Sequence, residues 1–499
     1  MSFLISLLFT FSAQAQLQPM SLQEAQSILS HPSAEVQSHL EVAPEVYTFK
    51  NNSGIESVDY SGQVLRQTLI SDFKVVAASI RRGEFAGQED QAFQTLNSFY
   101  DYKSDALKVS PKSANGATPH LIKAKGKSGQ SIPVYEYYYL DILEGSKNLK
   151  SKIAGVDNPL QQGKLLGWES LSLAGINLDQ DGDGALTPDE FMVGMMKVVA
   201  KNAAGKSFTV DNGLGGVEEI LAASMTEEGV DLAELSQKFL NGAVSFSQAA
   251  RDYLSVDLGP GKGLLADNTA QAGQAYTNLQ HHWDEAFGYF GAARNYLQLD
   301  VQQVSKGIAV DSFDEGEYIG MDQGDGEISL QSEKNFSVAV YAAQRDAGAA
   351  GQDTAMSVSL MDAFLKGRHL LQTQPQDYLT YAQAFSVIAL NEWEKAMAAT
   401  AIHYINDLIA DLESYGTQEY HFERVAKHFA EMKGFALAFQ FNPSSAISLS
   451  DFEQIHNKLG DHPVLPTETG VQAYISGLKE ARKILQDRFG FSDVTVKGW

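Results

Sequence analysis

The chain has 499 residues, of which 44% are hydrophobic and 20% are charged, proportions typical of a protein with a packed core. Its 37 basic and 62 acidic residues give a net charge of −25, which argues against binding to nucleic-acid phosphates or to anionic lipid. The sequence contains no cysteine, which excludes disulfide bonds, thiolate metal sites and lipid attachment through a cysteine. We therefore predict no nucleic-acid partner and no thiol chemistry.

The N-terminus has the pattern of a secretory signal peptide, predicted over residues 1–15. An apolar run at residues 3–11 is followed by Ala13-Gln14-Ala15, an A-x-A cleavage sequence. The run is shorter than the roughly 20 residues that a membrane-spanning helix needs. It departs from the usual pattern because no Lys or Arg precedes it. We expect a mature chain that starts near Gln16, a secreted or periplasmic location, and no membrane span.

Residues 16–150 are predicted to form a helical part with a few short extended segments. Residues 46–49 and 58–60 are expected to be extended on either side of an Asn52-Ser53-Gly54 turn. Apolar residues then recur at helical spacing over residues 63–80 and 89–100. Residues 108–131 are rich in Gly, Ser and Lys, which predicts a loop.

Residues 179–190 carry the full pattern of an EF-hand calcium loop. Such a loop supplies oxygen ligands to a hard cation at fixed positions: carboxylates at 1, 3 and 5, a backbone carbonyl at 7, a direct or water-mediated ligand at 9 and a bidentate glutamate at 12. Gly184 occupies position 6, where the chain turns sharply. The predicted Ca²⁺ ligands are Asp179, Asp181, Asp183, Ala185, Thr187 and Glu190.

Aspartate and glycine are also common in ordinary surface turns, because both tolerate left-handed backbone. A chance turn does not account for the apolar Leu186 at position 8, the Glu190 at position 12 and the helical pattern that follows. The preceding residues, 163–178, hold several glycines and serines, so we expect a short or irregular first helix there. Residues 155–210 are predicted to be an EF-hand insertion.

The rest of the chain is predicted to be mainly all-α, with antiparallel helices in one or two bundles and a C-terminal bundle at residues 230–490. Alanine is abundant and strand-like alternation is scarce. The expected helices lie at residues 233–253, 271–296, 331–347, 355–371, 377–415, 420–441, 449–458 and 467–489.

Two further segments resemble incomplete EF-hand loops. Residues 322–333 run from Asp to Glu but have one residue too few before the Gly-x-Ile core, so the site predicted there is weak. An acidic turn that caps the next helix explains the same residues. Residues 446–452 resemble the second half of a loop, but a Ser-x-x-Asp helix start is sufficient to explain them. The candidate ligands of the weak site are Asp322, Asp325, Glu327 and Glu333.

Several segments outside the calcium loop form a second pattern: Tyr47-Thr48-Phe49, Val58-Asp59-Tyr60-Ser61-Gly62-Gln63, Leu240-Asn241-Gly242-Ala243-Val244, Trp283-Asp284-Glu285-Ala286-Phe287-Gly288-Tyr289-Phe290-Gly291, Ala363-Phe364-Leu365-Lys366-Gly367-Arg368 and Lys433-Gly434-Phe435. This pattern resembles a family of secreted bacterial helical proteins classed as a domain of unknown function. The resemblance covers most of residues 45–490, with the calcium segment as an insertion. It implies an exported all-α protein and no established activity. In architecture and context the chain also loosely resembles imelysin-like, iron-linked helical proteins.

Two His-x-x-Glu pairs are candidate transition-metal ligands, because each places an imidazole and a carboxylate on one helix face. They are His282 with Glu285, and His428 with Glu431. Known bundle metal sites use the reverse order, Glu-x-x-His. The alternative is that each polar pair satisfies itself beside core aromatic residues.

Known enzyme signatures are absent: the sequence has no H-E-x-x-H, no G-x-S-x-G, no P-loop and no dinucleotide fingerprint. We therefore predict a non-enzymatic, secreted calcium-binding protein with no catalytic residues. Its predicted partners are calcium and a cell-envelope or receptor protein. Two alternatives stay open: a periplasmic component of metal or haem-iron acquisition that uses the His/Glu pairs, and a hydrolase with an unrecognised site.

Overall fold

The computed structural model describes residues 17–103, 147–158, 163–301, 304, 332–351 and 353–499, and the backbone of short strands at 108–109, 123–125, 131–133, 137–138 and 327–328. The predicted signal peptide and most of the predicted 108–131 loop lie outside the described residues. So do Asp322, Asp325 and the side chain of Glu327.

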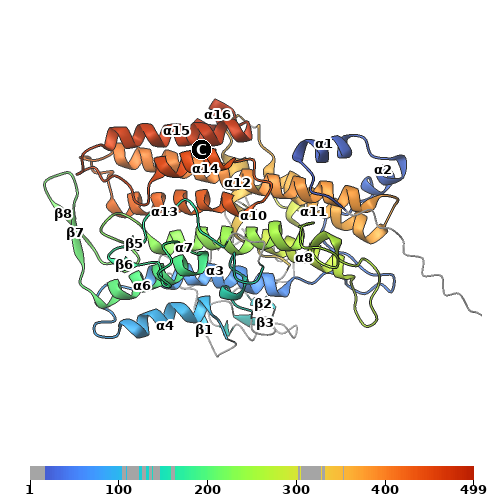
Figure 1. The fold of residues 1–499 in the computed structure, drawn as a ribbon, viewed down its shortest axis with the longest axis horizontal. Helices are drawn as coiled ribbons and strands as arrows, with labels where there is room; N and C mark the ends of the chain where they lie inside the picture. Colours follow the sequence, from blue (N-terminus) through green and yellow to red (C-terminus); the bar gives the residue numbers. More distant parts are fainter. Residues whose placement is uncertain are drawn as a thin grey trace, which may run out of the picture.

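The protein is mainly α-helical, as predicted, and many of its helices lie roughly along the long axis of the molecule (Figure 1). The N-terminal helices are α1 (Leu22–Ser30), α2 (Ala34–Leu40), α3 (Ser61–Ser79) and α4 (Glu89–Tyr100). The middle of the chain forms α6 (Pro188–Ala204), α7 (Leu232–Leu240) and α8 (Asn278–Phe290). The C-terminal helices are α10 (Ser337–Gly348), α11 (Met356–Thr373), α12 (Tyr378–Glu413), α13 (Phe422–Ala438), α14 (Leu449–Leu459), α15 (Val471–Phe489) and α16 (Asp493–Gly498).

The described strands are short. Two antiparallel hairpins flank α6: β5 (Ser172–Leu173) pairs with β6 (Ile176–Asn177), and β7 (Phe208–Asp211) pairs with β8 (Val217–Ile220). The remaining strands are β1 (Lys108–Val109) with β4 (Tyr137–Tyr138), and β2 (Lys123–Lys125) between antiparallel β3 (Ser131–Pro133) and parallel β9 (Glu327–Ile328). The sequence predicts no strands at β7 and β8. Ile220 of β8 packs with Met225 and Phe422 in a small hydrophobic cluster.

The 36-residue helix α12 is the central support of the C-terminal half and contacts α1, α10, α11, α13 and α15. Its alanine-rich segment from Ala396 to Ala401, which also contains Met397 and Thr400, is buried, and small side chains allow neighbouring helices to approach closely. One hydrophobic core includes residues of α3, α6, α7, α8 and α10 to α15. The division of the chain at residues 150–155, 210 and 230 remains a prediction, and α6 contributes to this common core.

Two expected helices differ from the structure. The segment before the calcium loop, residues 163–178, contains the β5–β6 hairpin in place of the expected irregular helix. Gly175, with a φ of +72°, and Ala174, with a φ of +48°, form its left-handed turn, which a helix does not accommodate. The helix expected at 233–253 begins as α7 and continues as π-helix at Asn241–Phe246 and Ala249–Tyr253. Periodicity did not indicate this wider winding.

The two pieces expected to be extended, residues 46–49 and 58–60, form no strand, and one β-bridge lies between them, from Lys50 to Glu56. Between them the Asn51 side chain accepts hydrogen bonds from the backbone N–H groups of Ser53 and Ile55, at 3.0 and 3.1 Å. The Ser57 N–H donates to the Phe49 carbonyl at 2.8 Å. The turn predicted at Asn52-Ser53-Gly54 is therefore present.

Segments of the second sequence pattern meet in the core through close glycine contacts. A Cβ atom at Gly367 of α11 would lie 2.1 Å from the ring of Trp283 in α8, and one at Gly288 of α8 would lie 2.7 Å from Tyr60. Such distances are below any tolerated contact, so these glycines allow α8 to approach α11 and the start of α3. These glycines of the sequence pattern therefore lie at positions where helices pack closely.

A buried ion pair joins the same segments. The Arg368 guanidinium donates to the Asp284 carboxylate at 2.8 Å, and both side chains are fully buried. The Tyr47 hydroxyl donates a hydrogen bond to the same carboxylate oxygen at 2.8 Å, and Arg368 also donates to the Ser57 carbonyl at 3.2 Å. This cluster ties the N-terminal turn to α8 and α11.

Candidate metal centre

Residues 179–190, which we name the calcium loop after the ion predicted to bind there, lie between the β5–β6 hairpin and α6. Gly182 and Gly184 have φ of +77° and +81°, a conformation that other residues rarely adopt, so the backbone turns as the sequence predicts. Thr187 caps α6, because its hydroxyl accepts the Glu190 N–H at 3.2 Å while the Glu190 carboxylate accepts the Thr187 N–H at 2.9 Å. Pro188 fits the first turn of this helix.

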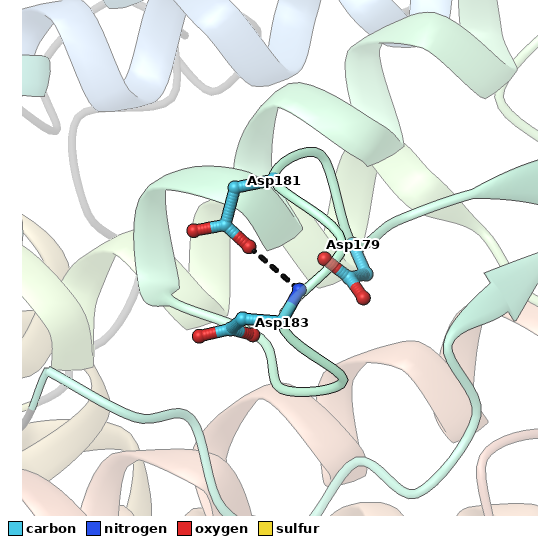
Figure 2. A group of neighbouring side chains, drawn as sticks. All are labelled: Asp179, Asp181 and Asp183. Atoms are coloured by element: carbon cyan, nitrogen blue, oxygen red, sulfur yellow. Dashed lines mark hydrogen bonds between the residues drawn. The ribbon is translucent and has the colours of Figure 1, made fainter.

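Three predicted ligands come together. One carboxylate oxygen from each of Asp179, Asp181 and Asp183 lies within 4.8 Å of the others, and Figure 2 shows the three side chains gathered on the loop. Among the residues that the structure describes, no other group of three or more His, Asp or Glu side chains meets this condition. Three carboxylate oxygens at this separation suit a hard cation that takes oxygen ligands.

Backbone N–H groups hold these carboxylates in place. Asp179 accepts from Gly182 at 2.7 Å and from Gly184 at 2.9 Å, Asp181 accepts from the Asp183 N–H at 3.0 Å, and Asp183 accepts from Ala185 at 2.8 Å. The bond from Gly184 in particular lowers the pKa of Asp179 below its usual value. Asp179 is buried, whereas Asp181 and Asp183 are exposed. The backbone of the loop therefore stabilises the negative charge of Asp179.

The other predicted ligands occupy the loop positions expected of them but lie outside the aspartate group. The Glu190 carboxylate accepts from the Gln180 N–H at 3.0 Å and takes part in the cap with Thr187. To act as a bidentate ligand, Glu190 must exchange these hydrogen bonds for the ion. Ala185 is half-buried and Thr187 is exposed.

A backbone hydrogen bond that the sequence did not reveal holds the second half of the loop. The Leu165 N–H donates to the Leu186 carbonyl at 2.7 Å, and both side chains are buried. Position 8 of an EF-hand loop usually pairs with a second loop, and here residue 165 takes that place. No local pattern marks residue 165, so only the tertiary structure identifies it.

The first His/Glu pair is committed to other partners. The His282 ring is within hydrogen-bonding distance of the Gly263 carbonyl, at 3.0 Å, and Glu285 accepts from Gln63 at 2.8 Å. His281, and not His282, is the imidazole near Glu285, at 3.9 Å. His282 and Glu285 are therefore not partners of each other in this structure, and their role as metal ligands stays a prediction.

The two residues of the second pair, His428 and Glu431, also contact other partners. The His428 Nδ1 atom lies 2.6 Å from Asp411, which also binds Arg424, while Glu431 forms an ion pair with buried Lys238 at 3.1 Å. The four residues do not assemble into one metal group among the described side chains. Each residue contacts partners outside its own pair, so the alternative explanation, in which each pair satisfies itself, is not what the structure shows.

The incomplete loops lie only partly within the described residues. Glu333 is buried, whereas Asp322, Asp325 and the side chain of Glu327 lie outside the described residues. At residues 446–452, Ser448 and Asp451 form a capping box at the start of α14, which explains the segment without a metal. The buried Glu394 carboxylate accepts the Ala446 N–H at 2.9 Å.

These observations define a mainly helical protein with a triple-aspartate loop on its surface. Residues 189–461 match the model of the family described as a domain of unknown function, DUF4856, and the chain belongs to this family. The match begins inside the loop and ends after α14, so it is narrower than the resemblance expected from the sequence. It gives no support to an EF-hand or imelysin-like relationship.

No curated protein and no solved structure matches the chain. Among the described residues, no helix combines the length and apolar character needed to cross a membrane.

Proposed function

We propose that this protein binds Ca²⁺ through residues 179–190 and that the ion has a structural or regulatory role. The observation that carries the proposal is the convergence of three aspartate carboxylates within 4.8 Å of one another, on a loop with glutamate at its twelfth position. The loop connects to α6, which contributes Phe191, Met192 and Met195 to the core. An ion that holds the loop therefore stabilises the attachment of α6.

The energetic benefit follows from linkage between binding and folding. Extracellular calcium modules have dissociation constants of about 10⁻⁴–10⁻³ M. A ligand present at about 100 times its dissociation constant stabilises the folded state by about 2.7 kcal/mol. We expect calcium, and magnesium to a smaller extent, to raise the unfolding temperature, since Mg²⁺ requires a tighter octahedral arrangement.

The test is isothermal titration of the purified mature chain with CaCl₂ after chelator treatment. The wild-type protein should bind one calcium ion at this loop. The Asp179→Ala, Glu190→Gln double variant should abolish that binding and the calcium-dependent rise in unfolding temperature. A wild-type protein that shows neither heat nor a melting shift contradicts the proposal.

Two single variants provide a matched comparison within the loop. Glu190→Gln and Asp189→Asn each remove one negative charge from adjacent positions, but only Glu190 is a predicted ligand. Asp189 instead accepts a hydrogen bond from Tyr100 at 2.6 Å. Glu190→Gln should weaken calcium binding by at least about tenfold, or ~1.4 kcal/mol, and Asp189→Asn by less than about threefold. Equal effects would indicate general charge attraction in place of ligation.

We also propose that the protein is exported, on the basis of the apolar run at residues 3–11 and the Ala13-Gln14-Ala15 sequence. The N-terminal sequence of the protein recovered outside the cytoplasm should begin near Gln16. Retention of the full N-terminus inside the cell would contradict export.

A further inference from the structure

A short segment that we name the strap, residues 163–171, crosses beside the calcium loop. It is joined to the loop by the Leu165 N–H, which donates to the Leu186 carbonyl at 2.7 Å. At the other end of the strap, the Leu171 carbonyl accepts a hydrogen bond from the Leu178 N–H at 2.8 Å. Leu178 immediately precedes Asp179, the first predicted ligand. The strap therefore contacts the chain on both sides of the predicted ligands.

Two polar side chains on either side of α14 anchor the strap. The Gln440 side chain accepts the Leu166 N–H at 2.8 Å and donates to the Leu166 carbonyl at 3.2 Å. The Asp461 carboxylate accepts the N–H groups of Glu169 and Ser170, at 2.9 and 2.7 Å. These residues lie more than 270 positions from the strap, so the anchors belong to the C-terminal half of the protein.

Asp461 is itself held from the other side by a buried cation. The Lys433 ammonium lies 3.4 Å from its second oxygen, and the Lys433 side chain is fully buried. The same ammonium lies 5.5 Å from the centre of the Trp168 ring, which is part of the strap. The ion pair with Lys433 and the two backbone hydrogen bonds therefore hold the Asp461 carboxylate in position.

The strap also borders a cavity. This cavity of about 420 Å³ lies between the strap, the calcium loop and α14, and its lining includes Gly167, Ala185, Phe452 and His456. Leu165 and Trp168 of the strap are buried in the core, and the Trp168 ring lies 4.7 Å from that of Phe191 in α6. The hydrogen bonds to Gln440 and Asp461 act together with this packing in positioning the strap beside the loop.

We propose that Gln440 and Asp461 are positioning residues for the calcium site, acting through the strap. Ala185, whose carbonyl is a predicted ligand, immediately precedes Leu186, so the bond from Leu165 restricts the orientation of that part of the loop. A preorganised loop loses less freedom when it binds the ion and therefore binds it more tightly. By reciprocity, bound calcium strengthens the attachment of the strap to the C-terminal helices.

The inference rests on the proposed calcium binding and is tested with Gln440→Met. This variant removes both hydrogen bonds to Leu166 and preserves the approximate length of the side chain without changing charge. Its calcium dissociation constant should rise more than twofold, up to a limit of about fivefold set by one net hydrogen bond, at a temperature well below unfolding. Gln440→Glu keeps the acceptor for the Leu166 N–H and loses the donor, so its effect should be smaller.

The matched control is Lys201→Met. Lys201 is exposed and donates to the Ala174 carbonyl at 3.0 Å, so the variant removes a bond to the β5–β6 hairpin and leaves the strap untouched. Its calcium affinity should stay within about twofold of wild type, since exposed interactions of this kind contribute little.

Hydrogen exchange supplies a second measurement of the same coupling. In the wild-type protein, calcium should slow exchange at the backbone amides of Leu165, Leu166, Glu169 and Ser170, and Gln440→Met should reduce this effect. If the wild-type protein binds calcium and folded Gln440→Met and Gln440→Glu bind it with the same affinity as wild type, this inference is overturned and the proposed function stands. Absence of calcium binding by the wild-type protein would overturn the proposed function, and this inference with it.

Discussion

The calcium loop and the buried Asp284–Arg368 pair illustrate two ways in which this chain places charge. In the loop, the hydrogen bonds to the three aspartates come from residues no more than five positions away. In the buried pair, the partners are 84 positions apart, and Tyr47 bonds to Asp284 across 237 positions. The loop is a local arrangement that sequence encodes directly, whereas the pair exists only because distant segments fold together.

The two regions also differ in how far their charged side chains are exposed to water. Asp181 and Asp183 are exposed, so solvent screens their mutual repulsion and a cation can reach them. Asp284 and Arg368 are fully buried, and burial raises the pKa of Asp284 although Arg368 opposes that shift. Charge in the loop is available for binding, while charge in the core constrains packing.

The largest effect is expected at the buried pair. Asp284→Asn leaves the Arg368 guanidinium in the core without a counter-charge, so the free energy of unfolding should fall by about 3–5 kcal/mol. Denaturant titration at constant pH measures this. A double variant, Asp284→Asn with Arg368→Met, should lose less than the single variant, because no buried charge is then left unpaired.

A partly exposed ion pair on α11, the helix that carries Arg368, is the control. Lys366 and Asp362 lie 2.7 Å apart on α11, and their side chains are 32% and 41% exposed. Asp362→Asn should therefore change the free energy of unfolding by less than about 0.5 kcal/mol. Similar losses in Asp362→Asn and Asp284→Asn would remove the distinction between the two environments.

The second largest effect is a pH dependence that arises from Glu394. Burial raises the pKa of this carboxyl, on α12, from 4.5 to about 7. Between these values the folded protein holds a proton that the unfolded chain releases, so the free energy of unfolding falls as the pH rises. The change from this group is about 3 kcal/mol, and it is complete above pH 7.

Glu394→Gln should remove that slope, because glutamine does not titrate. Denaturant titrations between pH 5 and pH 8 should show a smaller loss of stability in the variant and a more stable variant at pH 8. Glu413→Gln makes the same charge change at an exposed position of α12 and should leave the slope as in wild type. A slope that survives in Glu394→Gln would assign the dependence to other groups.

The difference between local and non-local signals explains how far the sequence could be interpreted. Helix α4 was predicted at residues 89–100 and lies at those residues, because its apolar spacing and its boundaries are local properties. The triple-aspartate loop was predicted for the same reason. By contrast, His428 was paired with Glu431 by helical spacing, whereas Asp411, 17 positions away on α12, is its actual partner.

The environment of the calcium loop was harder to predict than the loop itself. The irregular first helix expected before it is a hairpin, because Ala174 and Gly175 take left-handed conformations. Leu165, Gln440 and Asp461 carry no motif, and their relation to the loop depends on the packing of α13 and α14. Spacing along one helix or loop is visible in a single sequence, and contacts between elements are not.

The third effect concerns the close approach of α8 to α11. Gly367→Ala places a methyl group 2.1 Å from the Trp283 ring, so packing must shift, and the free energy of unfolding should fall by about 1–3 kcal/mol. The control is Gly477→Ala in α15, where the nearest atom would be 3.7 Å away. That variant should be more stable by about 0.5–1 kcal/mol, because alanine favours helix. Denaturant titration of both variants decides whether glycine serves packing or merely occupies a helix.

The smallest effect returns to the local region and concerns the cap that holds Glu190. Thr187→Ala removes the hydroxyl that accepts the Glu190 N–H at 3.2 Å, and loss of such a cap costs about 1 kcal/mol. This cost should appear in calcium-free unfolding measurements, while Thr187→Ser, which keeps the hydroxyl, should stay within about 0.5 kcal/mol of wild type. Thr187 is itself a predicted ligand, and ligation by Glu190 requires its carboxylate to release the Thr187 hydroxyl, so the stability difference between the two variants should change when calcium is added. An unchanged difference would argue against ligation by both Thr187 and Glu190.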